Sequence, residues 1–225
     1  MQIVILAGGL GTRLGSKTKD IPKSLVEIEG KPFIEYQFDL LRKHNFTNII
    51  LCVGHLHEQI RDYCKTVKDL HIQFSLDDGY GTWDALRNAE AFLENKFMVM
   101  YGDSYLKINF NEFKRYCSQH YGFPLIVTMC KCKNNNGNIY KAKLGHFYYN
   151  QNIHGNLIDY GLLCLDKQLL YNIPLDVDKL PDVLTMLSFN NQIAGYIVDH
   201  TFYEIGSVEG LEDFSNYIRG SNDNK

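Results

Sequence analysis

A glycine-rich turn followed by an arginine is the first feature of the chain whose residue types suggest chemistry. Residues 6–14 read LAGGLGTRL, so an apolar run leads directly into three glycines and then Arg13. Glycines let a polyphosphate approach backbone N–H groups closely, and the guanidinium fork of an arginine matches phosphate oxygens. The turn therefore indicates a phosphate site, although a tight strand-to-helix connection would also explain the glycines.

The spacing excludes two familiar phosphate loops. A Walker A loop needs a lysine directly after its second glycine, but Gly15 is followed by Ser16. The dinucleotide-binding pattern needs a third glycine at the position of Leu14. Further along, Pro22 fixes the backbone just before Lys23. Lys23 either returns to the glycine-rich turn or is a solvated surface lysine.

The segments that must position these residues alternate between strand-like and helix-like patterns. Apolar runs predict strands at residues 2–6, 48–53, 71–76 and 97–101. Apolar spacing and flanking residues predict helices at residues 32–44, 57–67, 82–93 and 111–120. This alternation is typical of an α/β fold, in which helices cover both faces of a parallel sheet.

After Pro124 the pattern changes. Strands are predicted at residues 125–132, 140–149, 157–165 and 192–205, and helices at residues 177–187 and from Ser207 to about residue 218. We expect residues 1–219 to form one domain, with a nucleotide-binding half at 1–123 and a sugar-phosphate-binding half at 124–219. Residues 220–225 are expected to be a frayed tail.

The composition is that of a globular protein that uses small ligands. Of its 225 residues, 45% are hydrophobic and 22% are charged, and the formal net charge is −3. The chain therefore has no excess of positive charge that would attract nucleic acid or an anionic membrane. No apolar run approaches the roughly 20 residues of a membrane-spanning helix, and the N-terminus lacks a signal-peptide pattern. The six cysteines are interpreted as reduced thiols of a cytoplasmic protein.

Residues 6–14 together with Ile21-Pro22-Lys23 resemble the signature of the sugar-1-phosphate nucleotidylyltransferases. Later motifs agree in order, namely GKPFI at 30–34, GT at 81–82, YGD at 101–103, IDYG at 158–161 and FYEIG at 202–206. The resemblance spans residues 1–214 and is strongest to the compact members that include D-glycero-D-manno-heptose 1-phosphate guanylyltransferases. It implies a Rossmann-like nucleotidyltransferase fold, with a mixed, mostly parallel central sheet flanked by helices on both faces.

The resemblance also implies an activity. The family joins a sugar 1-phosphate, here from a hexose or heptose, to a nucleoside triphosphate, here GTP or CTP, and releases pyrophosphate. The product would be a nucleotide-activated sugar for a surface polysaccharide or glycoconjugate, and a homodimer is compatible with the family. Because the nucleophile is already an anion, the chemistry requires positioning and charge neutralisation rather than a general base.

The site residues follow from the same resemblance. The catalytic residues would be Arg13, Lys23 and Asp103, and the cofactor Mg²⁺ would be held by Asp103 and Glu204. The nucleotide would contact Leu6, Gly8, Gly9, Gly11, Thr12, Gly81, Thr82 and Trp83. The sugar phosphate would contact Asp159, Gly161, Lys141 and Lys143. Asp103 could instead cap a turn, and Glu204 could be a solvated edge residue, because the family usually has aspartate there.

The chain departs from the family pattern at two places. Trp83-Asp84 stands where the family has two small residues, so Trp83 either lines the pocket or anchors a helix in the core. Asn150 or a neighbour stands where many members have a lysine that meets the sugar phosphate; Lys141, Lys143 or Arg87 compensates, or the acceptor is unusual. Two other functions therefore stay open: a cytidylyltransferase for a non-sugar phosphate such as phosphocholine, and a catalytically silent nucleotide-binding homologue.

Overall fold

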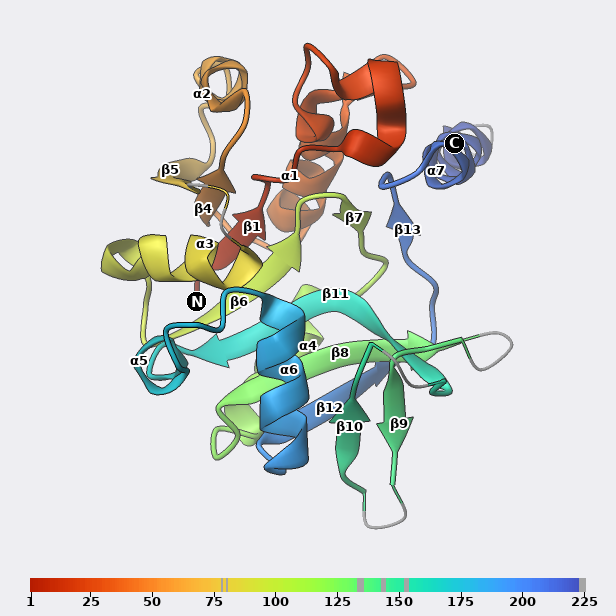
Figure 1. Cartoon of the computed structure of the whole chain (residues 1–225). Helices are drawn as coiled ribbons and strands as arrows, with labels where there is room; N and C mark the ends of the chain where they lie inside the picture. The colour runs from red at the N-terminus through yellow and green to blue at the C-terminus, as the bar shows by residue number, and fades with distance from the viewer. Residues whose placement is uncertain (78, 80, 133–135, 143–144, 152–153, 223–225) are drawn as a thin grey trace.

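The structure is a computed structural model that describes residues 1–222 except 78, 80, 133–135, 143–144 and 152–153 (Figure 1). The parallel part of its central sheet comprises β1 (Ile3–Leu6), β4 (Asn48–Val53), β5 (His71–Leu76) and β6 (Lys96–Tyr101). β1 pairs in parallel with β4 on one side and with β6 on the other, and β5 pairs with β4. β1, β4 and β6 are apolar and largely buried, as is usual for parallel strands covered on both faces.

The second half of the chain extends the same sheet beyond β6. β11 (Leu157–Asp166) runs antiparallel to β6, and β8 (Leu125–Lys131) runs antiparallel to β11. β12 (Ile193–Val198) is parallel to β8, and a hairpin of β9 (Ile139–Lys141) and β10 (Phe147–Tyr149) joins β11. The result is the mixed, mostly parallel sheet that the sequence predicts.

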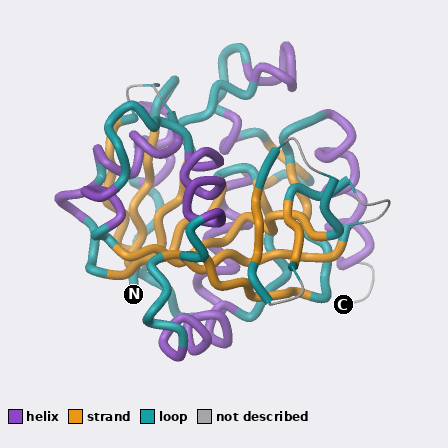
Figure 2. The backbone as a smooth tube through the Cα atoms, turned by 60° about the horizontal axis from the view of Figure 1, so that its bottom comes forward, coloured by secondary structure: helices purple, strands orange, loops and turns teal. Residues whose placement is uncertain are grey.

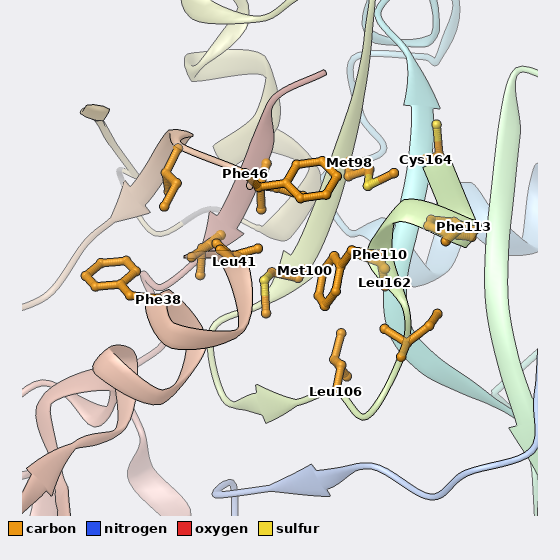
Figure 3. Packing of buried hydrophobic residues seen from close by; sticks show 14 of the residues in the cluster. Phe38, Leu41, Phe46, Met98, Met100, Leu106, Phe110, Phe113, Leu162 and Cys164 are labelled. Atoms are coloured by element: carbon orange, nitrogen blue, oxygen red, sulfur yellow. The ribbon is translucent and has the colours of Figure 1, made fainter. Parts of the chain in front are cut away.

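Helices cover both faces of this sheet (Figure 2). Side chains alternate along a strand, so Ile3 and Ile5 of β1 join one buried cluster and Val4 joins the other. The first face carries α1 (Phe33–Lys43), α2 (His57–Cys64) and α4 (Phe110–Gln119), and Figure 3 shows part of its cluster. The second face carries α3 (Thr82–Asn88), a 3₁₀ turn (Glu90–Phe92), α5 (Leu169–Asn172) and α6 (Leu180–Phe189). None of the described helices is both long and apolar enough to cross a bilayer.

Two short strand pairs lie outside the main sheet and bring distant segments together. β2 (Glu27–Ile28) pairs with β3 (Lys31–Pro32), and β7 (Ser104–Tyr105) pairs with β13 (Tyr203–Glu204). The last helix, α7 (Val208–Asn222), follows β13 (Figure 1).

A third buried cluster fills the space between these pairs and α7. Phe214 of α7 is fully buried, and its ring centroid lies 5.4 Å from Phe33, 5.2 Å from Tyr36 and 4.9 Å from Tyr105. The cluster also contains Leu14, from the 3₁₀ segment Thr12–Thr18 that follows the glycine-rich turn. The C-terminal helix therefore packs directly against the segments that carry the candidate phosphate-binding residues.

Two strand predictions were wrong in the same way. Residues 140–149 form the hairpin of β9 and β10 rather than one strand, with Gly145 at φ 86° in the turn between them. Residues 192–205 form β12 and β13, because Val198 ends the pairing with β8 and Tyr203 begins the pairing with β7. Each run is broken by a change of pairing partner that its apolar pattern does not reveal.

The predictions at the helix ends have mixed outcomes. Ser207 caps α7 as predicted, because its Oγ accepts a hydrogen bond of 3.1 Å from the N–H of Gly210. Pro181 lies in the first turn of α6, where backbone N–H groups have no acceptor within the helix, so the proline costs no helical hydrogen bond. α7 continues to Asn222, so residues 220–222 belong to this helix.

We predict that truncating Phe214 loosens the third cluster selectively. Phe214→Ala should lower the free energy of unfolding by about 3–5 kcal/mol, the usual range for a buried phenylalanine. Hydrogen exchange should accelerate in residues 23–36 and 203–218 while β4 and β5 keep their protection. Phe113→Ala, an equally buried residue of α4 in the first cluster, is the control. If both variants accelerate the same segments, the third cluster is not a separate packing unit.

Candidate active site

A cleft of about 770 Å³ lies at the carboxyl ends of the central strands. The chain leaves β1 for β4 and β5 on one side, then returns to β6 on the other side of β1. Ligands of open α/β sheets bind at such a switch point. The lining includes residues within two positions of the ends of β1, β4, β5 and β6, among them Gly8, Gly54, Asp77 and Asp103.

The glycine-rich turn forms one wall of this cleft. Leu6, Gly8 and Gly9 line it, whereas Gly11 and Thr12 are not among the lining residues. Gly11 has φ 66°, and its carbonyl oxygen accepts hydrogen bonds from the Thr18 hydroxyl (2.8 Å) and the Leu14 N–H (2.9 Å). These bonds close the turn and direct the following Arg13 back toward β13.

Arg13, Lys23 and Asp103 converge as the sequence predicts, although they come from three different segments. The Lys23 Nζ lies 2.5 Å from Asp103 Oδ2, with side chains 12% and 25% exposed. A Cβ placed on Gly206 would lie 2.9 Å from Arg13 Nη2, 3.4 Å from Lys23 Nζ and 3.5 Å from Asp103 Oδ2. Gly206 therefore marks the point where two cations and one carboxylate meet.

The turn that carries Asp103 is held by hydrogen bonds from two sides. Gln37 of α1 is fully buried, and its Nε2 donates to the carbonyl oxygens of Tyr101 and Ser104, both at 2.9 Å. The carbonyl oxygen of Asp103 accepts from the N–H of Ile205 at 2.9 Å. Sequence reasoning missed Gln37; a glutamine among the apolar residues of α1 was the available signal.

Asp103 and Glu204 are a suitable pair for a divalent cation. Glu204 of β13 pairs in register with Ser104, next to Asp103, and both carboxylate residues line the cleft. Within the described part of the chain, no group of three or more His, Cys, Asp and Glu side chains could hold a metal by itself. A pair of carboxylates fits Mg²⁺, which takes its remaining ligands from phosphates and water.

The far wall of the cleft carries a buried carboxylate. Asp159 of β11 accepts hydrogen bonds from the hydroxyl of Tyr101 (2.8 Å) and the N–H of Gly161 (2.9 Å). Burial raises the pKa of Asp159 to about 6, and both hydrogen bonds oppose that rise. Asp159 and Gly161 line the cleft as predicted, and so does Tyr149, which sequence reasoning missed. The hydrogen-bond partners of the Asp159 carboxylate are Tyr101 and Gly161, and Lys141 is not one of them.

The cations that could replace the missing acceptor-side lysine lie elsewhere. Lys141 is exposed on β9 with its Nζ 5.5 Å from the Phe147 ring centroid, and it is not among the lining residues. Arg87 donates hydrogen bonds to carbonyl oxygens of the loop before α6, including that of Pro174 at 2.7 Å, so its guanidinium binds that loop. Lys143 lies outside the described residues. Among the described residues of the far wall, none is a lysine or an arginine.

The expectation that Trp83 faces a ligand is wrong. Gly81 and Thr82 line the cleft, but Trp83 is fully buried in the second cluster, on the inner side of α3. The backbone N–H of Trp83 donates to the carbonyl oxygen of Asp178 at 2.8 Å, and the Thr82 hydroxyl accepts from the backbone N–H of Leu180 at 2.9 Å. The bulky residue therefore anchors α3 against the sheet and the loop before α6, which is the alternative that its sequence position left open.

Comparison with known proteins agrees with this geometry. A model of the family described as "Nucleotidyl transferase" matches residues 2–140. D-glycero-alpha-D-manno-heptose 1-phosphate guanylyltransferase of Campylobacter jejuni is 38% identical over 116 residues, which are 51% of this chain and 52% of that protein. Choline-phosphate cytidylyltransferase of Streptococcus pneumoniae is 38% identical over 109 residues, covering 47% of this chain and 46% of that protein. The matched segment thus spans about half the length of these curated relatives.

A solved structure extends the likeness to the rest of the chain. HddC from Yersinia pseudotuberculosis, in complex with GMP-PN, superposes with a TM-score of 0.80 at 25% identity. The superposition covers 96% of this chain and 99% of HddC.

We predict that Gly206→Ala weakens phosphate binding without unfolding the protein. The new Cβ would displace the guanidinium of Arg13, a flexible side-chain end, and loss of a charged hydrogen bond is worth about 1.5–3 kcal/mol. The affinity for inorganic pyrophosphate, measured by calorimetry, should fall by about 10- to 100-fold. Gly122→Ala is the control, because a Cβ there meets nothing within 4 Å. Equal affinity in both variants would contradict the placement of Arg13.

A second prediction concerns the pH dependence of stability. Because the pKa of Asp159 is raised from 3.8 to about 6, the native state binds more protons than the unfolded state between these pH values. The free energy of unfolding should therefore fall by about 3 kcal/mol through this residue as the pH rises across that interval. Asp159→Asn should lose this component in denaturant titrations, and Asp199→Asn, at an exposed position, should keep it. Identical pH profiles of Asp159→Asn and wild type would show that Asp159 ionises normally.

Proposed function

The chain belongs to the nucleotidyl transferase family, and from this membership and its cleft we propose that it joins a sugar 1-phosphate to a nucleoside triphosphate. The products are a nucleotide-activated sugar, for a surface polysaccharide or glycoconjugate, and pyrophosphate. The observation that carries the proposal is the convergence of Arg13, Lys23 and Asp103 around Gly206 at the switch point of the sheet. The presence of Arg13, Lys23 and Asp103 together argues against a catalytically silent binder.

The reaction that we propose has one transfer step. An oxygen of the sugar phosphate forms a bond to the α-phosphorus, while the bond from that phosphorus to the oxygen bridging to the β-phosphorus breaks. Both partners are anions, so the residues must neutralise charge and align the reacting atoms. Lys23 holds the phosphates near the reacting centre, and Arg13 stabilises the leaving pyrophosphate. The backbone N–H groups of the turn at Gly8 and Gly9 provide further donors.

Asp103 and Glu204 are the residues that would hold Mg²⁺, which when bound supplies positive charge to the phosphates. Without ligands, the Lys23 ammonium and the Asp103 carboxylate neutralise one another at 2.5 Å. Substrate phosphates and a cation offer each of them a new partner of opposite charge. The ion pair therefore gives each of the two charges a partner of opposite sign within the cleft.

A second candidate acceptor is phosphocholine. The far wall combines the Asp159 carboxylate with the aromatic rings of Tyr101, Tyr149 and Phe202, and the described part of that wall has no lysine or arginine. Aromatic faces and a carboxylate bind quaternary ammonium groups. The likeness to a choline-phosphate cytidylyltransferase supports this alternative as well.

We predict that pyrophosphate is released only with a matched triphosphate and acceptor. The assay should combine ATP, CTP, GTP and UTP with hexose 1-phosphates, heptose 1-phosphates and phosphocholine in the presence of Mg²⁺. Asp103→Asn should reduce kcat at least about 100-fold, because a cation ligand worth several kcal/mol is lost, with little change in melting temperature. Asp199→Asn should retain kcat. Near-normal turnover of Asp103→Asn would overturn its assignment as a metal ligand.

A further inference from the structure

We propose that Gln37 is a positioning residue that sets the two candidate metal-binding carboxylates, Asp103 and Glu204, in place for a divalent cation. The inference rests on the proposed function and adds to it a residue outside every motif of the sequence resemblance. Gln37 lies on the buried face of α1 and is not among the residues that line the cleft. It therefore acts through the turn that carries Asp103.

One amide group holds both ends of that turn. Gln37 Nε2 donates to the carbonyl oxygens of Tyr101 and Ser104, both at 2.9 Å. These two residues stand immediately before Gly102 and immediately after Asp103. Because two carbonyl oxygens face the amide, only its NH₂ group can bond them, and this fixes the orientation of the side chain. The two ends of the turn are therefore held together from α1.

Ser104 connects this amide to both carboxylates. Its hydroxyl donates to Asp103 Oδ1 at 3.3 Å, and its backbone is paired in register with that of Glu204. Ser104 is itself buried, so a shift of its carbonyl group displaces a packed residue. Such a shift reaches the Asp103 side chain on one side and β13 on the other. Gln37 thus influences the separation of two carboxylates that come from distant segments.

The other hydrogen bonds of the turn come from the backbone. The N–H of Gly102 donates to the carbonyl oxygen of Leu6 at 3.0 Å, and the N–H of Ile205 donates to that of Asp103 at 2.9 Å. These bonds tie the turn to β1 and to the end of β13 whatever the side chains are. The two bonds from Gln37 depend on a side chain, so a substitution can remove them while the backbone bonds remain.

Comparison with a second buried glutamine separates placement of the turn from stability. Gln2, which precedes β1, donates to the carbonyl oxygen of Phe92 at 2.8 Å and accepts from the N–H of Glu94 at 2.7 Å. In the part of the chain that the structure describes, Gln37 Oε1 is buried without a hydrogen-bond partner. An unpaired buried acceptor lowers stability and offsets part of what the two donated bonds contribute. This balance favours a role in placing the turn.

The expected consequence is a selective loss of cation affinity. Mg²⁺ demands near-ideal geometry from its ligands, so displaced carboxylates bind it less well. Residues that orient metal ligands without touching the metal typically change metal affinity by about 10- to 100-fold. Arg13 and Lys23 lie on other segments than α1, so phosphate binding should survive the loss of Gln37.

The test uses Mn²⁺ alone as the probe, because electron paramagnetic resonance measures its binding without turnover. Asp103→Asn identifies the ion bound at this site, which the wild type should bind and this variant should lose. Gln37→Met should bind that ion at least about 10-fold more weakly than the wild type. Gln2→Met, the matched control at the opposite end of β1, should change the affinity less than about 3-fold. Equal Mn²⁺ affinity in Gln37→Met and Gln2→Met would overturn the inference.

Inorganic pyrophosphate in the presence of EDTA gives the second readout. Calorimetry should place Gln37→Met within about 3-fold of the wild type, because the phosphate-binding cations are retained. An equal loss of Mn²⁺ and pyrophosphate binding would instead assign Gln37 to the folding of the whole site and overturn the positioning role. If Gln37→Met does not fold, Gln37→Asn takes its place. Asparagine keeps the amide but is one methylene shorter, so it cannot bond both carbonyl oxygens, and the same selective loss is expected.

The two proposals fail differently. If Gln37→Met binds Mn²⁺ as the wild type does and pyrophosphate is released in the activity assay, the proposed function stands and the positioning role is wrong. If the wild type binds no Mn²⁺ that Asp103→Asn loses, the positioning role fails whatever the activity assay shows. If, in addition, no pyrophosphate is released, the proposed function fails with it.

Discussion

The ion pair between Lys23 and Asp103 connects the two walls of the cleft on which the site depends. Lys23 follows the glycine-rich turn after β1, and Asp103 follows β6, the strand on the other side of the switch point. Both side chains are mostly withdrawn from water, so each partly replaces the hydration of the other. The pair therefore joins the segment after the glycine-rich turn to the turn after β6.

Apolar packing directly beside the charged cluster supports this arrangement. Leu14, Tyr105 and Ile205 are each one or two residues from a member of the charged cluster or from Gly206, and all three pack in or against the third buried cluster. Phe214 of α7 lies at the centre of that cluster. Since side chains so close to the site share one apolar contact surface, the C-terminal helix and the catalytic segments cannot shift independently.

The two sides of the cleft use different means of recognition. The side of the cleft beside β1, β4 and β5 is lined by the glycine-rich turn, further glycines and the carboxylate of Asp77. The far wall is built from side chains of β11 and its neighbours, with Asp159 buried and hydrogen-bonded to Tyr101.

Much of the fold could be predicted from local pattern. The strands at 48–53 and 71–76 have the predicted bounds, and the alternating elements of the first half follow from apolar runs separated by amphipathic segments. The glycine-rich turn was also recognisable from the sequence, because the positive φ of Gly11 is a backbone conformation that glycine adopts readily. Tertiary structure alone decided where residues 140–149 and 192–205 divide into two strands each. It also decided that Trp83 points into the core. Finally, it placed Gln37, Asp77 and Gly206 at the site. Each of these depends on which distant segment lies opposite the residue, and that partner is set by packing rather than by local sequence.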